Sequence, residues 1–118
     1  MPRSGHLRLL DIRDAIRGVQ DTVAGVDLAG YTASWQMQRA VERGLEIISE
    51  SSRHVPADVK ARHPEIPWKA IAAIGNHLRH EYHHVEPAII WEIATSRLAA
   101  LAGVIEAALR EPRPDPDG

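Results

Sequence analysis

The sequence predicts an all-α fold, an antiparallel bundle of four main helices in a single domain. Apolar residues recur every three or four positions over long stretches, which is the period of one face of an α-helix. No alternation of apolar and polar residues is long enough to build a sheet. Prolines stand at the borders of these stretches, where a helix tolerates them, and not inside. Together these observations predict helices throughout.

The first predicted helix spans residues 7–26, and a second begins at about residue 34 after a connector at residues 28–33. Their inward-facing residues are Leu9, Ile12, Ile16, Val19, Val23 and Val26 in the first, and Met37, Val41, Leu45 and Ile48 in the second. Gly44 interrupts the second helix, which costs about 1 kcal/mol relative to alanine. We therefore expect another helix to cross closely at Gly44.

A proline-rich connection at residues 51–66, with room for one helical turn, leads to the third predicted helix at residues 68–81. Pro67 and Pro87 stand at the starts of the third and fourth helices, a position that proline favours. The apolar stripes are Ile71, Ile74 and Leu78 in the third helix, and Ile90, Ala94, Leu98, Leu101, Ile105 and Ala108 in the fourth.

Length and composition indicate one soluble cytoplasmic domain. Its 118 residues suffice for one core, with residues 1–110 as the helical domain and residues 111–118 as a proline-rich disordered tail. Without cysteine there is neither a disulfide nor a thiolate metal site. We find no signal-peptide apolar region and no apolar run near the roughly 20 residues of a membrane span, so no membrane contact is expected.

The net charge of −2 argues against a protein that coats nucleic acid non-specifically. Any contact with nucleic acid must be local, built from Arg79, the histidines and Lys69 or Arg62. A transient contact between an enzyme and RNA remains compatible with this charge.

Residues 76–84 form a polar cluster with four of the seven histidines and one of the two tyrosines. Residues three and four apart share a helix face. Asn76, His80 and the pair at 83–84 therefore line one side of the third helix, away from its apolar stripe, with Gly75 and Arg79 on a flank. This strip is interpreted as an RNA-cleaving site, a metal site or a solvated face without chemistry.

The metal interpretation rests on the motif H-E-x-x-H, in which His80, Glu81 and His84 would be the ligands of a histidine-rich metal protein. A zinc protease of this kind also needs a sheet that holds its substrate and a third ligand. No sheet is predicted and no histidine follows His84. The motif therefore favours at most a looser metal site.

RNA cleavage needs neither metal nor cofactor, because the 2′-hydroxyl of RNA is a built-in nucleophile. Histidine, with an ordinary pKa near 6.5, can give or take a proton at neutral pH. His80 is the predicted general acid/base, Arg79 the phosphate contact, and Asn76 the group that orients the phosphate or the imidazole. One helix offers too few groups, so we expect a two-fold dimer to complete the site.

Four segments together resemble the HepT-like toxins of the HEPN superfamily, helical ribonucleases of toxin–antitoxin pairs. They are residues 40–50 (AVERGLEIISE), 64–71 (PEIPWKAI), 76–82 (NHLRHEY) and 90–91 (IW), and the similarity covers about residues 5–110 in order.

The resemblance implies a HEPN-like helical homodimer with an RNase site at the dimer interface. The family motif is an arginine, a polar residue, three more residues and then His-x-Tyr, which matches Asn76, His80 and Tyr82. Its members pair with an MntA-like nucleotidyltransferase antitoxin that inactivates the toxin by adenylylating the motif tyrosine, here Tyr82. The motif arginine falls at Gly75. Either Arg79 supplies that charge, or the protein is a catalytically lapsed partner subunit of a nucleotidyltransferase.

Overall fold

The computed structural model describes residues 4–81 and 86–111, and these residues form helices and no strands. The helices are α1 (Gly5–Val23), α2 (Leu28–Thr32), α3 (Trp35–Ser52), α4 (Ala57–Arg62), α5 (Trp68–Glu81), α6 (Pro87–Glu92), the π-helical turn η2 (Ile93–Arg97) and α7 (Leu98–Arg110). The last three form one continuous C-terminal helix, Pro87–Arg110. The predicted all-α class is confirmed.

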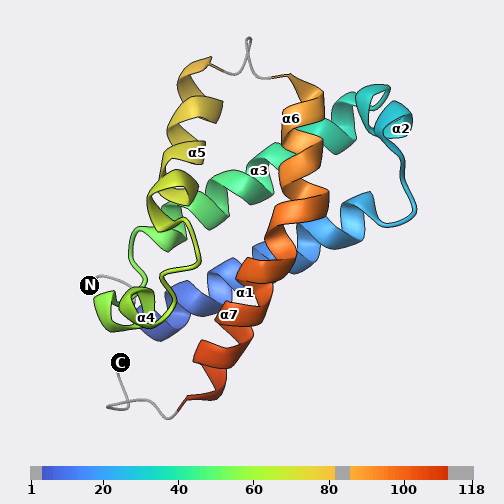
Figure 1. Cartoon of the computed structure of the whole chain (residues 1–118). Helices are drawn as coiled ribbons and strands as arrows, with labels where there is room; N and C mark the ends of the chain where they lie inside the picture. Colours follow the sequence, from blue (N-terminus) through green and yellow to red (C-terminus); the bar gives the residue numbers. More distant parts are fainter. Residues whose placement is uncertain (1–3, 82–85, 112–118) are drawn as a thin grey trace.

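Two antiparallel pairs make up the bundle (Figure 1). Helices α1 and α3 lie side by side, and α5 and the C-terminal helix run across them in opposite directions. Helix α5 packs on α3, and α7 packs on α1. This arrangement leaves α5 attached to the rest of the molecule mainly through α3.

Polar caps fix where the helices begin. The side chains of Ser4, Asp27 and Ser34 accept hydrogen bonds from backbone N–H groups three residues later, at the starts of α1, α2 and α3. The first helix ends at Val23 and not at residue 26, because Gly25 adopts a φ of 73° that stops the helix. The connector at residues 28–33 contains α2, and the proline-rich connection contains α4.

The core contains most of the predicted apolar stripes. The first helix contributes Leu9, Ile12, Ile16, Val19 and Val23, and the fourth contributes Ile90, Ala94, Leu98, Leu101, Ile105 and Ala108, all of them buried. Of the apolar stripe predicted for α5, only Leu78 is buried, while Ile71 and Ile74 are half-buried. The prediction that the α5 stripe faces the core is therefore confirmed only for Leu78.

The C-terminal helix is apolar beyond what its core stripe requires. It is long and apolar enough to cross a membrane, and its apolar 18-residue window has a mean hydropathy of 1.6, yet only 28% of that window is buried. Core helices of soluble proteins can also meet this criterion. Glu92, Arg97 and Glu106 interrupt the apolar run, so the sequence alone did not indicate a membrane span here.

Candidate active site

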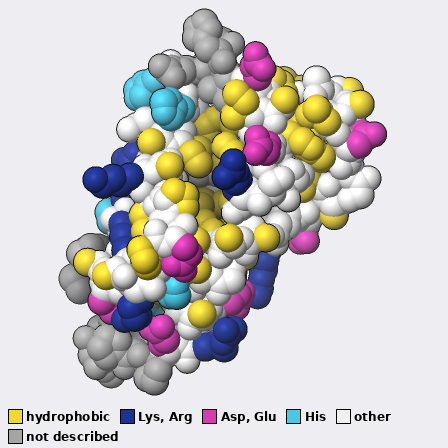
Figure 2. Space-filling view, viewed as in Figure 1, with side chains coloured by type: hydrophobic (Ala, Val, Ile, Leu, Met, Phe, Trp, Pro, Cys, Tyr) yellow, Lys and Arg dark blue, Asp and Glu magenta, His cyan; other side chains and the backbone are white. Residues whose placement is uncertain are grey.

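The exposed side of the last turns of α5 carries the three predicted catalytic residues. Asn76, Arg79 and His80 are exposed, whereas Leu78 between them is 6% exposed and anchors the helix. Asn76 precedes Arg79 by three residues and His80 by four, so both follow it on one helix face. Figure 2 shows histidine side chains gathered at this end of the molecule. The fold therefore presents the three groups to solvent together.

Asn76 holds the guanidinium of Arg79. Nη2 of Arg79 donates a hydrogen bond of 2.7 Å to Oδ1 of Asn76. Among the described residues, no carboxylate oxygen lies within 4.0 Å of this guanidinium. The positive charge is thus oriented by a neutral amide and stays available to an anion. Asn76 was expected to orient the phosphate or the imidazole, and its observed partner is the cation.

Gly75, at the place of the motif arginine, faces α3 and not solvent. Its N–H donates a 2.9 Å hydrogen bond to Oγ of Ser49, and Ser49 in turn donates to the carbonyl of Ala72 at 2.9 Å. A Cβ atom on residue 75 would lie 2.9 Å from Oγ and 3.3 Å from Cβ of Ser49. Close packing of α3 and α5 therefore closes this position to a side chain.

Arg79 covers the position that Gly75 leaves without a side chain. Its Nη1 atom lies 3.2 Å from where a Cβ on residue 75 would be. The guanidinium of Arg79 thus lies directly over the place where a motif arginine would begin. This geometry agrees with the expectation that Arg79 lies on the same flank as Gly75.

Two residues near the site escaped sequence reasoning, Ser49 and Arg53. Ser49 is 1% exposed, and Arg53 at the end of α3 donates from Nη2 to the carbonyl of Ala72 at 2.8 Å. The sequence does show that Ser49 is a small polar residue beside the apolar stripe of α3, and such a position suits a close helix crossing. Nothing in the sequence pairs Arg53 with α5, because 19 residues separate it from Ala72.

Arg62 and Lys69, the two other cations predicted to be able to contact nucleic acid, differ in their surroundings. Arg62 lies 3.1 Å from a carboxylate oxygen of Asp58 and also forms an ion pair with Glu111, so its charge is neutralised. Lys69, in the first turn of α5, is exposed, and the described residues place no carboxylate within 4.0 Å of it. Lys69 is therefore the one of the two that remains available to an anion.

Tyr82, the predicted adenylylation site, lies outside the described residues, together with His83 and His84. The side chain of Glu81 is also undescribed, so the metal interpretation based on His80, Glu81 and His84 stays a prediction. Within residues 4–80 and 86–111, no three acidic or histidine side chains are grouped as a metal site requires.

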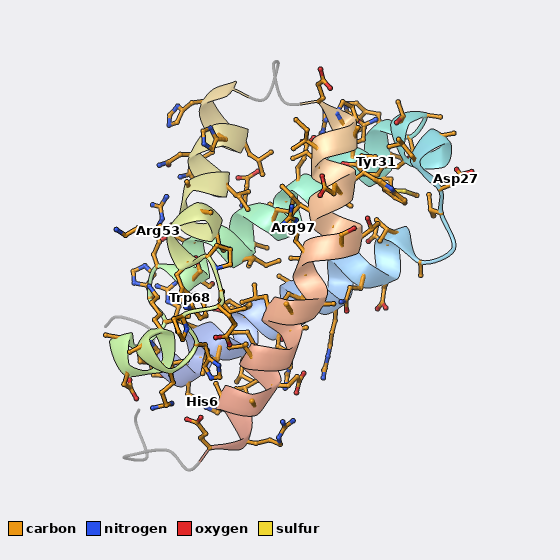
Figure 3. The ribbon with its side chains drawn as sticks, viewed as in Figure 1. His6, Asp27, Tyr31, Arg53, Trp68 and Arg97 are labelled. Atoms are coloured by element: carbon orange, nitrogen blue, oxygen red, sulfur yellow. The ribbon has the colours of Figure 1, made fainter. Side chains whose placement is uncertain are left out.

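The other tyrosine, Tyr31, is enclosed in the core. It is 0% exposed, and its ring centroid lies 5.3 Å from that of Trp91 (Figure 3). Burial, aided by the nearby carboxylate of Glu42, raises the pKa of Tyr31 to about 12, although Arg39 opposes the change. Its phenol is thus both inaccessible and hard to deprotonate.

An apolar groove of about 580 Å³ lies between α5 and the C-terminal helix. Ile71 and Ile74 line its α5 side, and Ile89 and Ile93 line its opposite side, with Ile89 52% exposed. Figure 2 shows the hollow with hydrophobic side chains around it and charged groups at its rim. The rim charges are Glu65, Glu92 and Arg97, the last labelled in Figure 3. The groove therefore explains why the α5 stripe is only half-buried.

The chain matches the sequence model of the family described as ribonuclease HepT-like over residues 12–108. A relative from Thermococcus cleftensis, named a probable ribonuclease HepT, is 34% identical over 90% of this chain and 96% of its own length. A relative from Caldanaerobacter subterraneus subsp. tengcongensis, provisionally named an RNase, is 31% identical over 77% of this chain and 81% of its own length. No solved structure matches the chain.

Proposed function

Because the chain belongs to the HepT-like ribonuclease family, we propose that it is a metal-independent endoribonuclease toxin whose site is completed by a second copy. The observation that carries the proposal is the guanidinium of Arg79, which no carboxylate of the described residues neutralises and which Asn76 holds beside His80 on the exposed end of α5. A cation that can contact a phosphate beside a group that can move a proton is the minimum that RNA cleavage requires.

The proposed reaction uses the ribose next to the scissile phosphate. His80 accepts the proton of the 2′-hydroxyl while the 2′-oxygen bonds to phosphorus and the bond from phosphorus to the 5′-oxygen breaks. The 5′-oxygen takes a proton from His80 of the second copy, which leaves a 2′,3′-cyclic phosphate and a 5′-hydroxyl. Arg79 stabilises the charge that develops on the non-bridging oxygens, a role that suits a preoriented guanidinium.

The groove supports the proposed dimer. Its walls carry isoleucines that are half-buried or, at Ile89, exposed. The C-terminal helix that forms one wall has an 18-residue window with a mean hydropathy of 1.6, and only 28% of that window is buried. Acidic and basic residues share the rim, as a surface that pairs with itself in a two-fold dimer needs.

Sedimentation equilibrium tests the dimer. We expect the wild type to be a dimer and Ile93→Glu in the groove to be a monomer. Leu28→Glu, which changes a residue 40% exposed on α2, is the matched control and should leave the dimer intact. A wild type that cleaves RNA as a monomer would disprove the shared site. Partition of the protein into lipid vesicles would mean that a membrane, and not a second copy, covers the groove.

The proposed regulator is an MntA-like nucleotidyltransferase antitoxin that adenylylates Tyr82 in the cytoplasm. The chain has only two tyrosines, and the core encloses Tyr31, so Tyr82 is the candidate acceptor. With such an antitoxin and ATP, peptide mass spectrometry should find one added AMP on the Tyr82 peptide and none after Tyr82→Phe. An AMP on Tyr31 would contradict the assignment.

Cleavage of RNA by purified protein in excess EDTA tests the activity itself. We expect cleavage by the wild type and loss of at least 100-fold in His80→Ala, the usual scale for a general acid/base. Cleavage that EDTA abolishes would restore the metal interpretation. No cleavage by protein with unmodified Tyr82 would favour the catalytically lapsed partner subunit, for which the glycine at position 75 is the specific observation.

A further inference from the structure

Two guanidinium groups lie one after the other along the seam between α3 and α5. Arg53 reaches across from the end of α3 to the carbonyl of Ala72, at 2.8 Å. One turn further along α5, Arg79 is held by Asn76 at 2.7 Å. Figure 3 shows Arg53 beside α5. Since helical residues rise 1.5 Å each, the two anchor points are about 6 Å apart along the axis.

Lys69 extends this row toward the start of α5. It precedes Ala72 by three residues, and Asn76 follows Ala72 by four, so the three anchor positions share one face of the helix. Lys69 is exposed, and about 16 Å of helix axis separates it from His80. We call Arg53, Lys69 and Arg79 the cationic edge.

The cationic edge is poor in counter-ions. By contrast, Arg17, Arg39 and Arg62 each form an ion pair with a carboxylate at 3.1 Å or less, for example Arg17 with Glu106 at 3.0 Å. The sequence of α5 holds no carboxylate from Trp68 to His80. Among the described carboxylates, Arg53 has only Glu50 within 4.0 Å, at 3.9 Å, and Glu50 is also 3.4 Å from His54. The net charge along the edge is therefore positive although the chain as a whole carries −2.

We propose that the cationic edge binds backbone phosphates of single-stranded RNA upstream or downstream of the cut, and so leads the strand along the α3–α5 seam to His80. This inference rests on the proposed ribonuclease function and adds where the substrate lies. An overall negative protein gains little from long-range attraction, so local phosphate contacts must hold its RNA. Arginine suits that role because its planar fork matches phosphate oxygens. The row is longer than one nucleotide can cover, which makes a strand of several nucleotides the fitting substrate.

Fluorescence anisotropy with a labelled unstructured oligoribonucleotide tests this binding in the uncleaving His80→Ala background. Arg53→Gln and Lys69→Gln should each weaken binding by roughly tenfold at low salt, and each should reduce the slope of log K against log salt by about 0.7, the value for one phosphate contact on a single strand. Arg17→Gln is the matched control on α1, 59% exposed and paired, and should change neither quantity.

Two further measurements separate binding from folding and from catalysis. Arg53→Lys keeps the charge and should recover most of the salt slope, whereas a merely structural role for the Ala72 hydrogen bond would not be rescued in this way. With an active wild type, Arg53→Gln should raise KM for the oligonucleotide and leave kcat and the cleavage of a dinucleotide unchanged.

The outcomes are distinct. Unchanged affinity and salt slope in both Arg53→Gln and Lys69→Gln would overturn the cationic edge even if the wild type cleaves RNA. Weakened binding in both variants, with no cleavage by the wild type, would support the edge and refute the catalytic proposal instead.

Discussion

Gly44 and Gly75 stand at two close helix crossings, and the atoms that face them differ in kind. At the α1–α3 crossing, a Cβ on residue 44 would collide with the Cγ2 methyl of Val19. At the α3–α5 crossing, a Cβ on residue 75 would meet the hydroxyl of Ser49, which donates to the carbonyl of Ala72 and accepts from the N–H of Gly75 itself. The first crossing is apolar and the second is polar.

This difference separates scaffold from site. An apolar crossing has no directional bonds, so Gly44 affects only how tightly α1 and α3 pack. The hydrogen bonds of Ser49 instead fix how α5 lies on α3, and so fix where Asn76, Arg79 and His80 point. They also close position 75, which leaves Arg79 as the cation nearest to the place of the motif arginine. The two glycines should therefore respond differently to substitution.

The largest expected effect comes from restoring the motif arginine with Gly75→Arg. We expect about 3 kcal/mol of lost stability from overpacking against Ser49, and RNA cleavage below that of the wild type, because the new side chain displaces Arg79. Urea denaturation and cleavage assays measure both. Gly18→Arg is the control, since nothing lies within 4 Å of a Cβ there. Increased cleavage with unchanged stability would show that position 75 opens to solvent.

A smaller effect is expected for Gly44→Ala. The added methyl overlaps Val19, and the unfolding free energy should fall by about 2 kcal/mol, as overpacked cores do. Cleavage per folded molecule should stay at the wild-type level, because no bond to α5 changes. Gly103→Ala, in open space on α7, should be neutral or stabilising by up to about 1 kcal/mol. A loss of cleavage in folded Gly44→Ala would contradict the view that the α1–α3 crossing affects stability alone and only the α3–α5 crossing positions the site.

The comparison also shows how far sequence reasoning reached. The glycine inside the second predicted helix correctly indicated a close crossing, and the apolar period predicted almost every buried residue of α1 and α7, because both signals are local to one helix. What Gly75 faces depends on Ser49, 26 positions earlier in the chain, and no periodicity encodes that pairing. The same holds for Arg53 and Ala72. The groove was not predicted for a related reason, because the sequence pattern does not distinguish a half-buried isoleucine from a buried one.

The smallest effect, and the sharpest test, concerns Ser49→Ala. Removing the hydroxyl deletes two hydrogen bonds between helices and should cost about 1 kcal/mol. The same change relieves the contact at position 75, so Gly75→Ala should destabilise Ser49→Ala less than it destabilises the wild type. Ser52→Ala is the control, because its hydroxyl bonds within α3, to the carbonyl of Ser49 at 2.7 Å.

A double-mutant cycle measured by urea denaturation gives the coupling, and residues in contact typically couple by 0.5 kcal/mol or more, on the order of RT. We expect coupling between Ser49 and Gly75 and additivity between Ser52 and Gly75. Additive costs in both cycles would mean that the hydroxyl of Ser49 does not set the spacing of α3 and α5. The close contact between Ser49 and Gly75 keeps a side chain out of position 75 and so leaves that space to the guanidinium of Arg79. If Ser49 does not set this contact, the position of Arg79 over Gly75 must have another cause.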